Sequence, residues 1–227
     1  MKQGSGSFLA GVRAEFPLLI GVFPFGLIYG AAALGAGLTP AAAQAMSSIV
    51  FAGTAQFITV QLLHEGAPAA VVVLTISVVN LRHILYSASV SPYVQHLPRR
   101  WKTLLAYLLT DEAYAATIVN YERHSATPNG HWFFLGAGLA LWTTWQASTA
   151  LGVFLGTTIP VSWPLDFAVP LTFIALVFPT LTDRPAALAA LSAGLSALLA
   201  HGLPYNSGLV LAALVGIAAG MIVEQRQ

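Results

Sequence analysis

The sequence has no cysteine and very few charged residues. The absence of cysteine excludes disulfides, thiolate chemistry and cysteine-based metal sites. Only 7% of the 227 residues are charged and 57% are hydrophobic, whereas about 25% of residues are charged in ordinary soluble domains. So few charges cannot cover the surface of a soluble domain. The net charge of +1 gives no reason to expect nucleic acid as a partner.

Catalytic motifs are lacking as well. His64 and Glu65 are not followed by the second histidine of a zinc-protease helix. No Gly-x-Ser-x-Gly motif, phosphate-binding loop or Gly-x-Gly-x-x-Gly run occurs. We therefore expect no enzyme, no cofactor and no metal site.

What the chain does have is long apolar runs. A helix that spans a bilayer needs roughly 20 predominantly apolar residues. Such windows predict an all-α membrane helix bundle of seven or eight segments, in a single membrane transport domain over residues 1–227. Some of the later segments are short enough to be broken or re-entrant. The expected segments cover residues 16–38, 41–63, 67–90, 101–119, from 132 to before Pro160, 167–181, 186–203 and 207–223.

Lys and Arg do not decide the orientation of these segments. Cytoplasmic loops are enriched in both residues, yet basic residues fall on both sides if all segments span. One resolution is that an early segment enters and leaves the membrane on the same face.

Three of the segments carry Gly-x-x-x-Gly. Small residues four apart form a flat stripe on a helix where another backbone can approach closely. The ordinary interpretation is packing within this chain, and the alternative is a docking face for a second membrane protein. The three pairs are Gly26 with Gly30, Gly152 with Gly156, and Gly216 with Gly220.

The third segment carries polar residues at positions where burial in the bilayer costs free energy. A charge at bilayer depth costs about 2.5–3.5 kcal/mol on insertion scales, and Arg82 lies well inside this segment. Arg82, Tyr86 and Ser89 share one helix face, and Asn80 and His83 lie on the adjacent face. The helix therefore presents a broad polar wall.

The fourth segment carries the opposite charge. Asp111 and Glu112 lie near its centre, and a continuous helix would place Tyr107 and Tyr114 on the side of Asp111. We expect Arg82 to pair with one of the two acids across neighbouring helices. The pair could be purely structural, but ionisable groups inside membranes are functional by default.

The second segment mixes small, hydroxyl and amide side chains between Ser47 and Phe57. One interpretation is tight packing against a neighbouring helix. The other is a broken stretch whose backbone groups and Gln56 line a substrate cavity.

Three motifs occur in a specific order: Phe51-Ala52-Gly53-Thr54-Ala55-Gln56-Phe57, then Asn80-Leu81-Arg82-His83, then Asp111-Glu112. In this, the chain resembles the AzlC-type branched-chain amino-acid permeases, the large subunit of two-component bacterial exporters. The resemblance implies export of leucine, isoleucine, valine and sometimes methionine across the bacterial cell (inner) membrane. It also implies coupling to the proton motive force and a small hydrophobic partner, an AzlD-type membrane subunit.

A branched-chain amino acid is a zwitterion, so its site needs a cation, an anion and an apolar pocket. We expect Arg82 to bind the carboxylate and Asp111 the ammonium, with Glu112 or His83 carrying a proton. The other predicted substrate-binding residues are Asn80, Gln56, Phe51, Gly53 and Thr54, with Phe57, Trp142 and Trp145 as further candidates for the apolar wall. A transporter of another small solute and a non-transporting scaffold subunit remain the alternatives.

Overall fold

The chain is built from helices. The computed structural model describes residues 2–123, 129–156, 181, 183–203 and 207–224. These ranges contain helices and short connections and no strand, which confirms the predicted all-α class. Three helices among them are long and apolar enough to cross a membrane: Gly4–Gly35, Ala69–Val94 and Ser207–Glu224. That number is below the predicted seven or eight. The second and fourth predicted segments are divided into shorter helices, and Arg184–Leu199 has only 16 residues.

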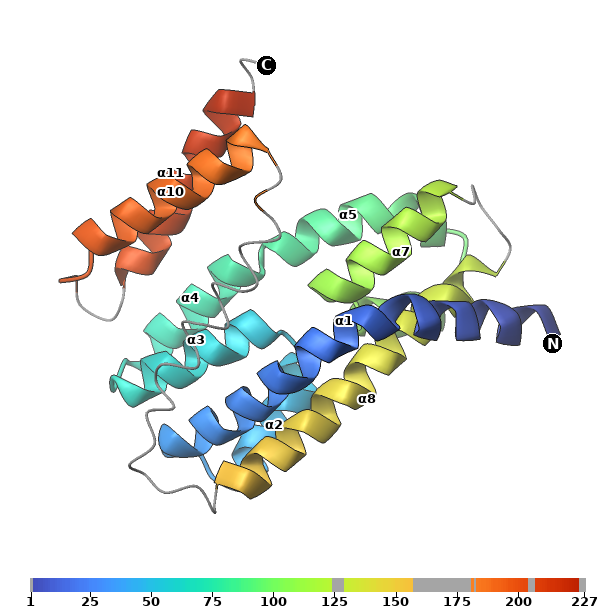
Figure 1. The fold of residues 1–227 in the computed structure, drawn as a ribbon, viewed down its shortest axis with the longest axis horizontal. Helices are drawn as coiled ribbons and strands as arrows, with labels where there is room; N and C mark the ends of the chain where they lie inside the picture. The colour runs from blue at the N-terminus through green and yellow to red at the C-terminus, as the bar shows by residue number, and fades with distance from the viewer. Residues whose placement is uncertain (1, 124–128, 157–180, 182, 204–206, 225–227) are drawn as a thin grey trace. The chain divides into compact units, whose positions relative to one another are not determined.

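The chain forms two compact units (Figure 1). One comprises Met1–Val60 and Val79–Pro160, and the other Gln61–Val78 and Val161–Gln227. The first holds α1 (Lys2–Gly35), α2 (Pro40–Val50), the start of α3 (Gly53–His64), α5 (Arg82–Val94), α6 (Arg99–Tyr107), α7 (Asp111–Arg123) and α8 (Gly130–Gly156). The second holds the end of α3, most of α4 (Ala69–Asn80), α10 (Arg184–Leu199) and α11 (Ser207–Glu224).

Helices α1 and α8 lie side by side and run in parallel through the first unit (Figure 1). Their glycines permit this close approach. A Cβ atom on Gly11 would lie 2.0 Å from the carbonyl oxygen of Phe133, and one on Gly30 would lie 2.5 Å from that of Thr149. The first two Gly-x-x-x-Gly stripes therefore pack against each other's helix, as the ordinary interpretation predicted.

The third glycine stripe is also occupied within the chain. A Cβ atom on Gly216 would lie 2.8 Å from Cβ of Ala193, and one on Gly220 would lie 3.2 Å from Cβ of Ala189. Both alanines belong to α10, which packs along α11. None of the three stripes is therefore left over as a docking face for another protein.

The second predicted segment is broken at Phe51. Helix α2 starts where Thr39 Oγ1 accepts a hydrogen bond from the backbone nitrogen of Ala42 at 3.2 Å, with Pro40 in the first turn. It ends at a left-handed Phe51 with φ 38° and ψ 48°. Its 11 residues rise only about 16 Å, too little to span a membrane.

The chain reverses direction at this break. Near the start of α2, the carbonyl of Ala43 accepts a hydrogen bond from Tyr29. Near its end, Ser48 donates a hydrogen bond to Gln146 of α8. Gln146 lies closer to the N-terminal ends of the parallel helices α1 and α8, so α2 runs opposite to both. Helix α3 starts beside Trp145 and returns, because its Phe57 ring lies 6.0 Å from the ring of Tyr29. This arrangement fits a segment that enters and leaves on one face.

The fourth predicted segment is not continuous, and this part of the prediction is wrong. Helix α6 ends at Tyr107 and α7 begins at Asp111. Thr110 and the two acids that follow it favour a helix start, because hydroxyl and carboxylate groups stabilise the free N–H groups of a first turn. Tyr107 therefore does not share a helix face with Asp111.

The remaining predicted segments agree with the structure where it describes them. Segments 132–159, 186–203 and 207–223 correspond to α8, α10 and α11. The third segment is divided into α4 and α5 only at Leu81, whose backbone dihedrals stay helical. Apart from residue 181, the segment 167–181 lies outside the described residues. Helix α1 begins well before residue 16, so Glu15 lies inside it.

Candidate functional site

An ion pair joins the first residue of α5 to the first residue of α7. Arg82 Nη1 lies 2.7 Å from Asp111 Oδ2, and the two side chains are 27% and 36% exposed. The predicted contact between the third and fourth segments is therefore present. Its partial exposure leaves both charges accessible to a small polar molecule.

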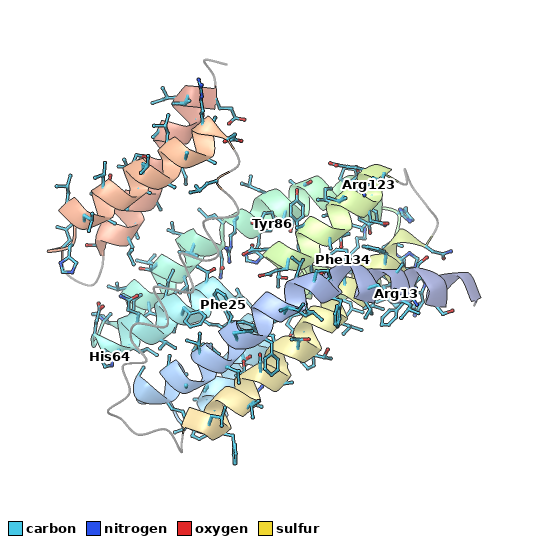
Figure 2. All side chains as sticks on the ribbon, viewed as in Figure 1. Arg13, Phe25, His64, Tyr86, Arg123 and Phe134 are labelled. Carbon is cyan, nitrogen blue, oxygen red and sulfur yellow. The ribbon has the colours of Figure 1, made fainter. Side chains whose placement is uncertain are left out.

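Tyrosines from the same two helix faces hold this pair in place. The rings of Tyr86 and Tyr114 stack with centroids 4.5 Å apart, and those of Tyr93 and Tyr121 with centroids 4.6 Å apart. The hydroxyl of Tyr114 donates a hydrogen bond to Ser89 Oγ at 3.0 Å. Figure 2 shows Tyr86 between α5 and α7. The predicted polar face of the third segment thus packs along α7.

The pair does not use all of its hydrogen-bonding capacity. Arg82 Nε, Asp111 Oδ1 and Asn80 Oδ1 are buried atoms without a hydrogen-bond partner among the described residues. One free donor and free acceptors therefore surround the ion pair. Buried polar atoms are normally satisfied, so such atoms indicate a ligand or water.

The two predicted proton carriers lie beside the ion pair. The ring nitrogen Nδ1 of His83 is 3.2 Å from the carbonyl oxygen of Asn80. His83 is close enough to Arg82 and Asp111 for their charges to act on it. Glu112 is likewise within the electrostatic reach of both residues of the pair. The structure brings all five predicted polar residues of the third and fourth segments together.

The other predicted substrate-binding residues gather at the break between α2 and α3. Trp145 Nε1 donates a hydrogen bond to Gln56 Oε1 at 3.1 Å, and a Cβ atom on Gly53 would lie 3.1 Å from the same indole. The Phe51 ring lies 5.9 Å from the ring of Tyr107. Thr54 lies in the first turn of α3.

The two groups of residues are connected through one short stretch of chain. Tyr107 ends α6 beside Phe51, and Asp111 begins α7 beside Arg82. The stretch 108–110 between them is buried. Three residues of backbone therefore separate the ion pair from the contacts at the α2–α3 break.

Tyr107 contacts the α2–α3 break, and not the ion pair where the sequence analysis placed it. Its hydroxyl donates a hydrogen bond to the carbonyl of Ser48 and accepts one from Trp142 Nε1 at 2.8 Å. Phe57, in contrast, packs on Tyr29 and Phe25. Both of these rings belong to α1.

A buried amide and hydroxyl network was also missed. Gln146 Oε1 accepts hydrogen bonds from Gln44 Nε2 at 2.8 Å and from Ser48 Oγ at 2.9 Å, and Gln146 Nε2 donates to the carbonyl of Ser47 at 3.1 Å. Ser47 and Thr149 share a further hydrogen bond at 3.1 Å. The signal was present in the sequence, since both glutamines lie inside predicted apolar segments.

Comparison with known proteins identifies similar membrane proteins. The family model described as AzlC protein matches residues 17–159. The chain is 27% identical over 227 residues to the inner membrane protein YgaZ of Escherichia coli, covering 96% of this chain and 90% of the relative. It is 32% identical over 217 residues to an uncharacterized membrane protein of Archaeoglobus fulgidus, covering 93% of each.

A third relative carries a functional name. The chain is 27% identical over 174 residues to the branched-chain amino acid transport protein AzlC of Bacillus subtilis, covering 74% of this chain and 66% of that protein. No solved structure matches the chain.

Proposed function

This chain belongs to the AzlC protein family, and we propose that it exports branched-chain amino acids across the bacterial inner membrane. Leucine, isoleucine and valine are the proposed substrates, with methionine as a further candidate. The name of the Bacillus subtilis relative supports this substrate class. The apolar helices of membrane length support a location in the bilayer.

The ion pair between Arg82 and Asp111 is the observation on which the proposal depends. Its two groups match the two ends of an amino acid, since the guanidinium suits a carboxylate and the carboxylate suits an ammonium. When the substrate binds, Arg82 would pair with its carboxylate and Asp111 with its ammonium, in place of the bond between Arg82 and Asp111. This exchange keeps the charge balance, so neither residue is left uncompensated.

Broken helices at the same site support a binding role for the backbone. Helices α3 and α7 begin at Gly53 and Asp111, inside two of the predicted segments, whereas the backbone stays helical through Leu81 before Arg82. A helix N-terminus presents unpaired N–H groups and a partial positive charge. Discontinuous helices of this kind form the substrate sites of many secondary transporters.

The apolar side chain of the substrate requires a second surface. We assign it to the rings around the α2–α3 break, where Phe51 contacts Tyr107 and Trp145 contacts Gln56. The aromatic rings would exclude water from the branched side chain. Gly53 keeps the backbone close to Trp145, because any larger residue would press on the indole.

Two further parts of the proposal concern the coupling of export to protons and the partner subunit. Glu112 and His83 lie within reach of the charges of Arg82 and Asp111, and we assign them to the coupling of export to protons. The small hydrophobic AzlD-type subunit is proposed as the partner. Export with and without that subunit tests its contribution directly.

Valine export from cells tests the proposed function. Wild-type chain, Arg82→Ala, Asp111→Asn and the control Arg13→Ala are each expressed with the small subunit and matched for membrane abundance. Arg13 is an exposed residue of α1. We expect the first two variants to lose most valine export and the control to retain it. Export near the wild-type rate in both site variants would rule out their assigned roles.

A further inference from the structure

Glu15 is a carboxylate in the interior of α1, and the site described above does not use it. Its side chain is fully buried, at 0% exposure. Neither Oε1 nor Oε2 has a hydrogen-bond partner among the described residues. A buried carboxylate without donors is rare, because an ionised group there keeps its whole desolvation penalty.

Close packing of the neighbouring helices accounts for the burial of this carboxyl. One turn before it, Gly11 meets the α8 backbone so tightly that a Cβ atom would lie 2.0 Å from the carbonyl oxygen of Phe133. On α8, a Cβ atom on Gly138 would lie 2.8 Å from Cβ of Leu108. Glu15 therefore lies in the part of α1 that packs most closely on α8.

No cation among the described residues forms an ion pair with Glu15. Glu112 on α7 is the charged neighbour that acts on it. Arg13 of α1 itself is exposed. The other titratable groups on the described parts of α7 and α8 are Asp111, Tyr114, Tyr121, Glu122, Arg123 and His131, and α2 has none.

The neutral acid is the form that this environment favours. An acidic neighbour adds repulsion to the desolvation penalty of an ionised Glu15. A metal ion is a poor alternative, since the described residues contain no group of three His, Cys, Asp or Glu that could hold one. A proton satisfies a single buried carboxyl without further ligands.

We propose that Glu15 is the proton-binding site that couples this transporter to the proton gradient, with Glu112 linking it to the substrate site. The inference rests on the proposed function. Glu112 lies within the electrostatic reach of Glu15 on one side and of Arg82 and Asp111 on the other. Substrate that separates the ion pair changes the field at Glu112, and hence the preference of Glu15 for its proton.

The proton step requires no other reactant. A proton from water binds one carboxylate oxygen of Glu15 and forms the neutral acid. On release the O–H bond breaks, the electron pair returns to the carboxylate and the proton goes to water on the other side. No redox change occurs.

Glu15→Gln tests the inference because the amide imitates the neutral acid in shape. Wild type, Glu15→Gln, Glu15→Asp and the control Glu122→Gln are reconstituted as full chains with the small subunit in liposomes. Glu122 is an exposed residue of α7. Two fluxes of labelled valine are compared, namely exchange at equal pH and accumulation driven by a pH gradient.

We expect Glu15→Gln to retain exchange and to lose at least ten-fold in gradient-driven accumulation. Glu15→Asp keeps a carboxyl and should recover part of the gradient-driven accumulation. Glu122→Gln should match wild type in both fluxes. Gradient-driven accumulation by Glu15→Gln at the wild-type level would overturn the inference. Accumulation driven by sodium and indifferent to pH in the wild type would overturn it as well.

Infrared difference spectroscopy separates this inference from the proposed function. A protonated carboxyl in an apolar site gives a carbonyl stretching band, and the wild type should show a component of this band that Glu15→Gln lacks. The band is measured without substrate, so it tests Glu15 even if the wild type moves no valine. An identical band in both proteins would overturn the assignment, whereas absent valine flux alone would overturn the proposed function.

Discussion

A Cβ atom built on Gly152 of α8 would lie 2.2 Å from the carbonyl oxygen of Leu27 on α1. Such a distance is a steric overlap with backbone atoms, which cannot rotate away. The close packing of α1 on α8 therefore requires that residue 152 carries no side-chain methyl group. Because the pair forms the centre of the first unit, the positions of α2 and α7 against α8 depend on it too.

Gly152→Ala should destabilise the protein, although alanine is the better helix former. The added methyl forces the helices apart, and overpacking of this kind costs about 1–3 kcal/mol. Gly21→Ala is the matched control, because a Cβ atom there meets nothing within 4 Å. In detergent, the apparent Tm should fall for Gly152→Ala and stay level or rise for Gly21→Ala. Equal Tm values for the two variants would contradict the packing argument.

The sequence predicted those parts of the fold that depend on local composition. Apolar runs located α8, α10 and α11, and the glycine spacing located the packed stripes. It missed the break between Tyr107 and Asp111, because hydropathy records that a stretch is apolar and not where its helix stops. Thr110 before two acids was the available signal.

Some features of the candidate site were likewise predictable from local sequence, and others depend on the fold. Arg82 and Asp111 were predictable as partners, since each is costly alone in a membrane. Glu15 lies just before the first predicted segment, which starts at residue 16, whereas α1 begins at Lys2. Its burial depends on the close packing of α1 on α8, a contact that the sequence cannot place without a fold.

Phe51 should tolerate glycine better than alanine. Its left-handed backbone costs a non-glycine residue about 1–2 kcal/mol, and glycine removes that cost. Both variants lose the buried ring and its contact with Tyr107, so both should be less stable than wild type. Phe51→Gly should melt above Phe51→Ala in the same detergent. Alanine melting higher than glycine would show that the backbone at this break is not held left-handed.

The bond between Tyr114 and Ser89 should show measurable coupling. Tyr114→Phe keeps the stack on Tyr86 and removes the hydroxyl that donates to Ser89 Oγ. A typical net hydrogen bond contributes about 0.5–1.5 kcal/mol. A double-mutant cycle with Ser89→Ala, measured by reversible unfolding, should therefore give a coupling energy in that range. Two effects that simply add would indicate that the helices are held by stacking alone.

Exchanging the two charges of the ion pair should separate its structural role from transport. Arg82→Asp alone places two acids side by side, and Asp111→Arg alone places two cations side by side. Each should lower both Tm and membrane abundance. The double variant Arg82→Asp with Asp111→Arg restores opposite charges over the same contact, so both properties should recover towards wild type. Valine export should nevertheless stay low, because the substrate's carboxylate and ammonium would have to change places while its side chain stays near Phe51. Abundance is measured by immunoblot and export in the same cells. Full recovery of export with abundance would show that the pair only stabilises the bundle.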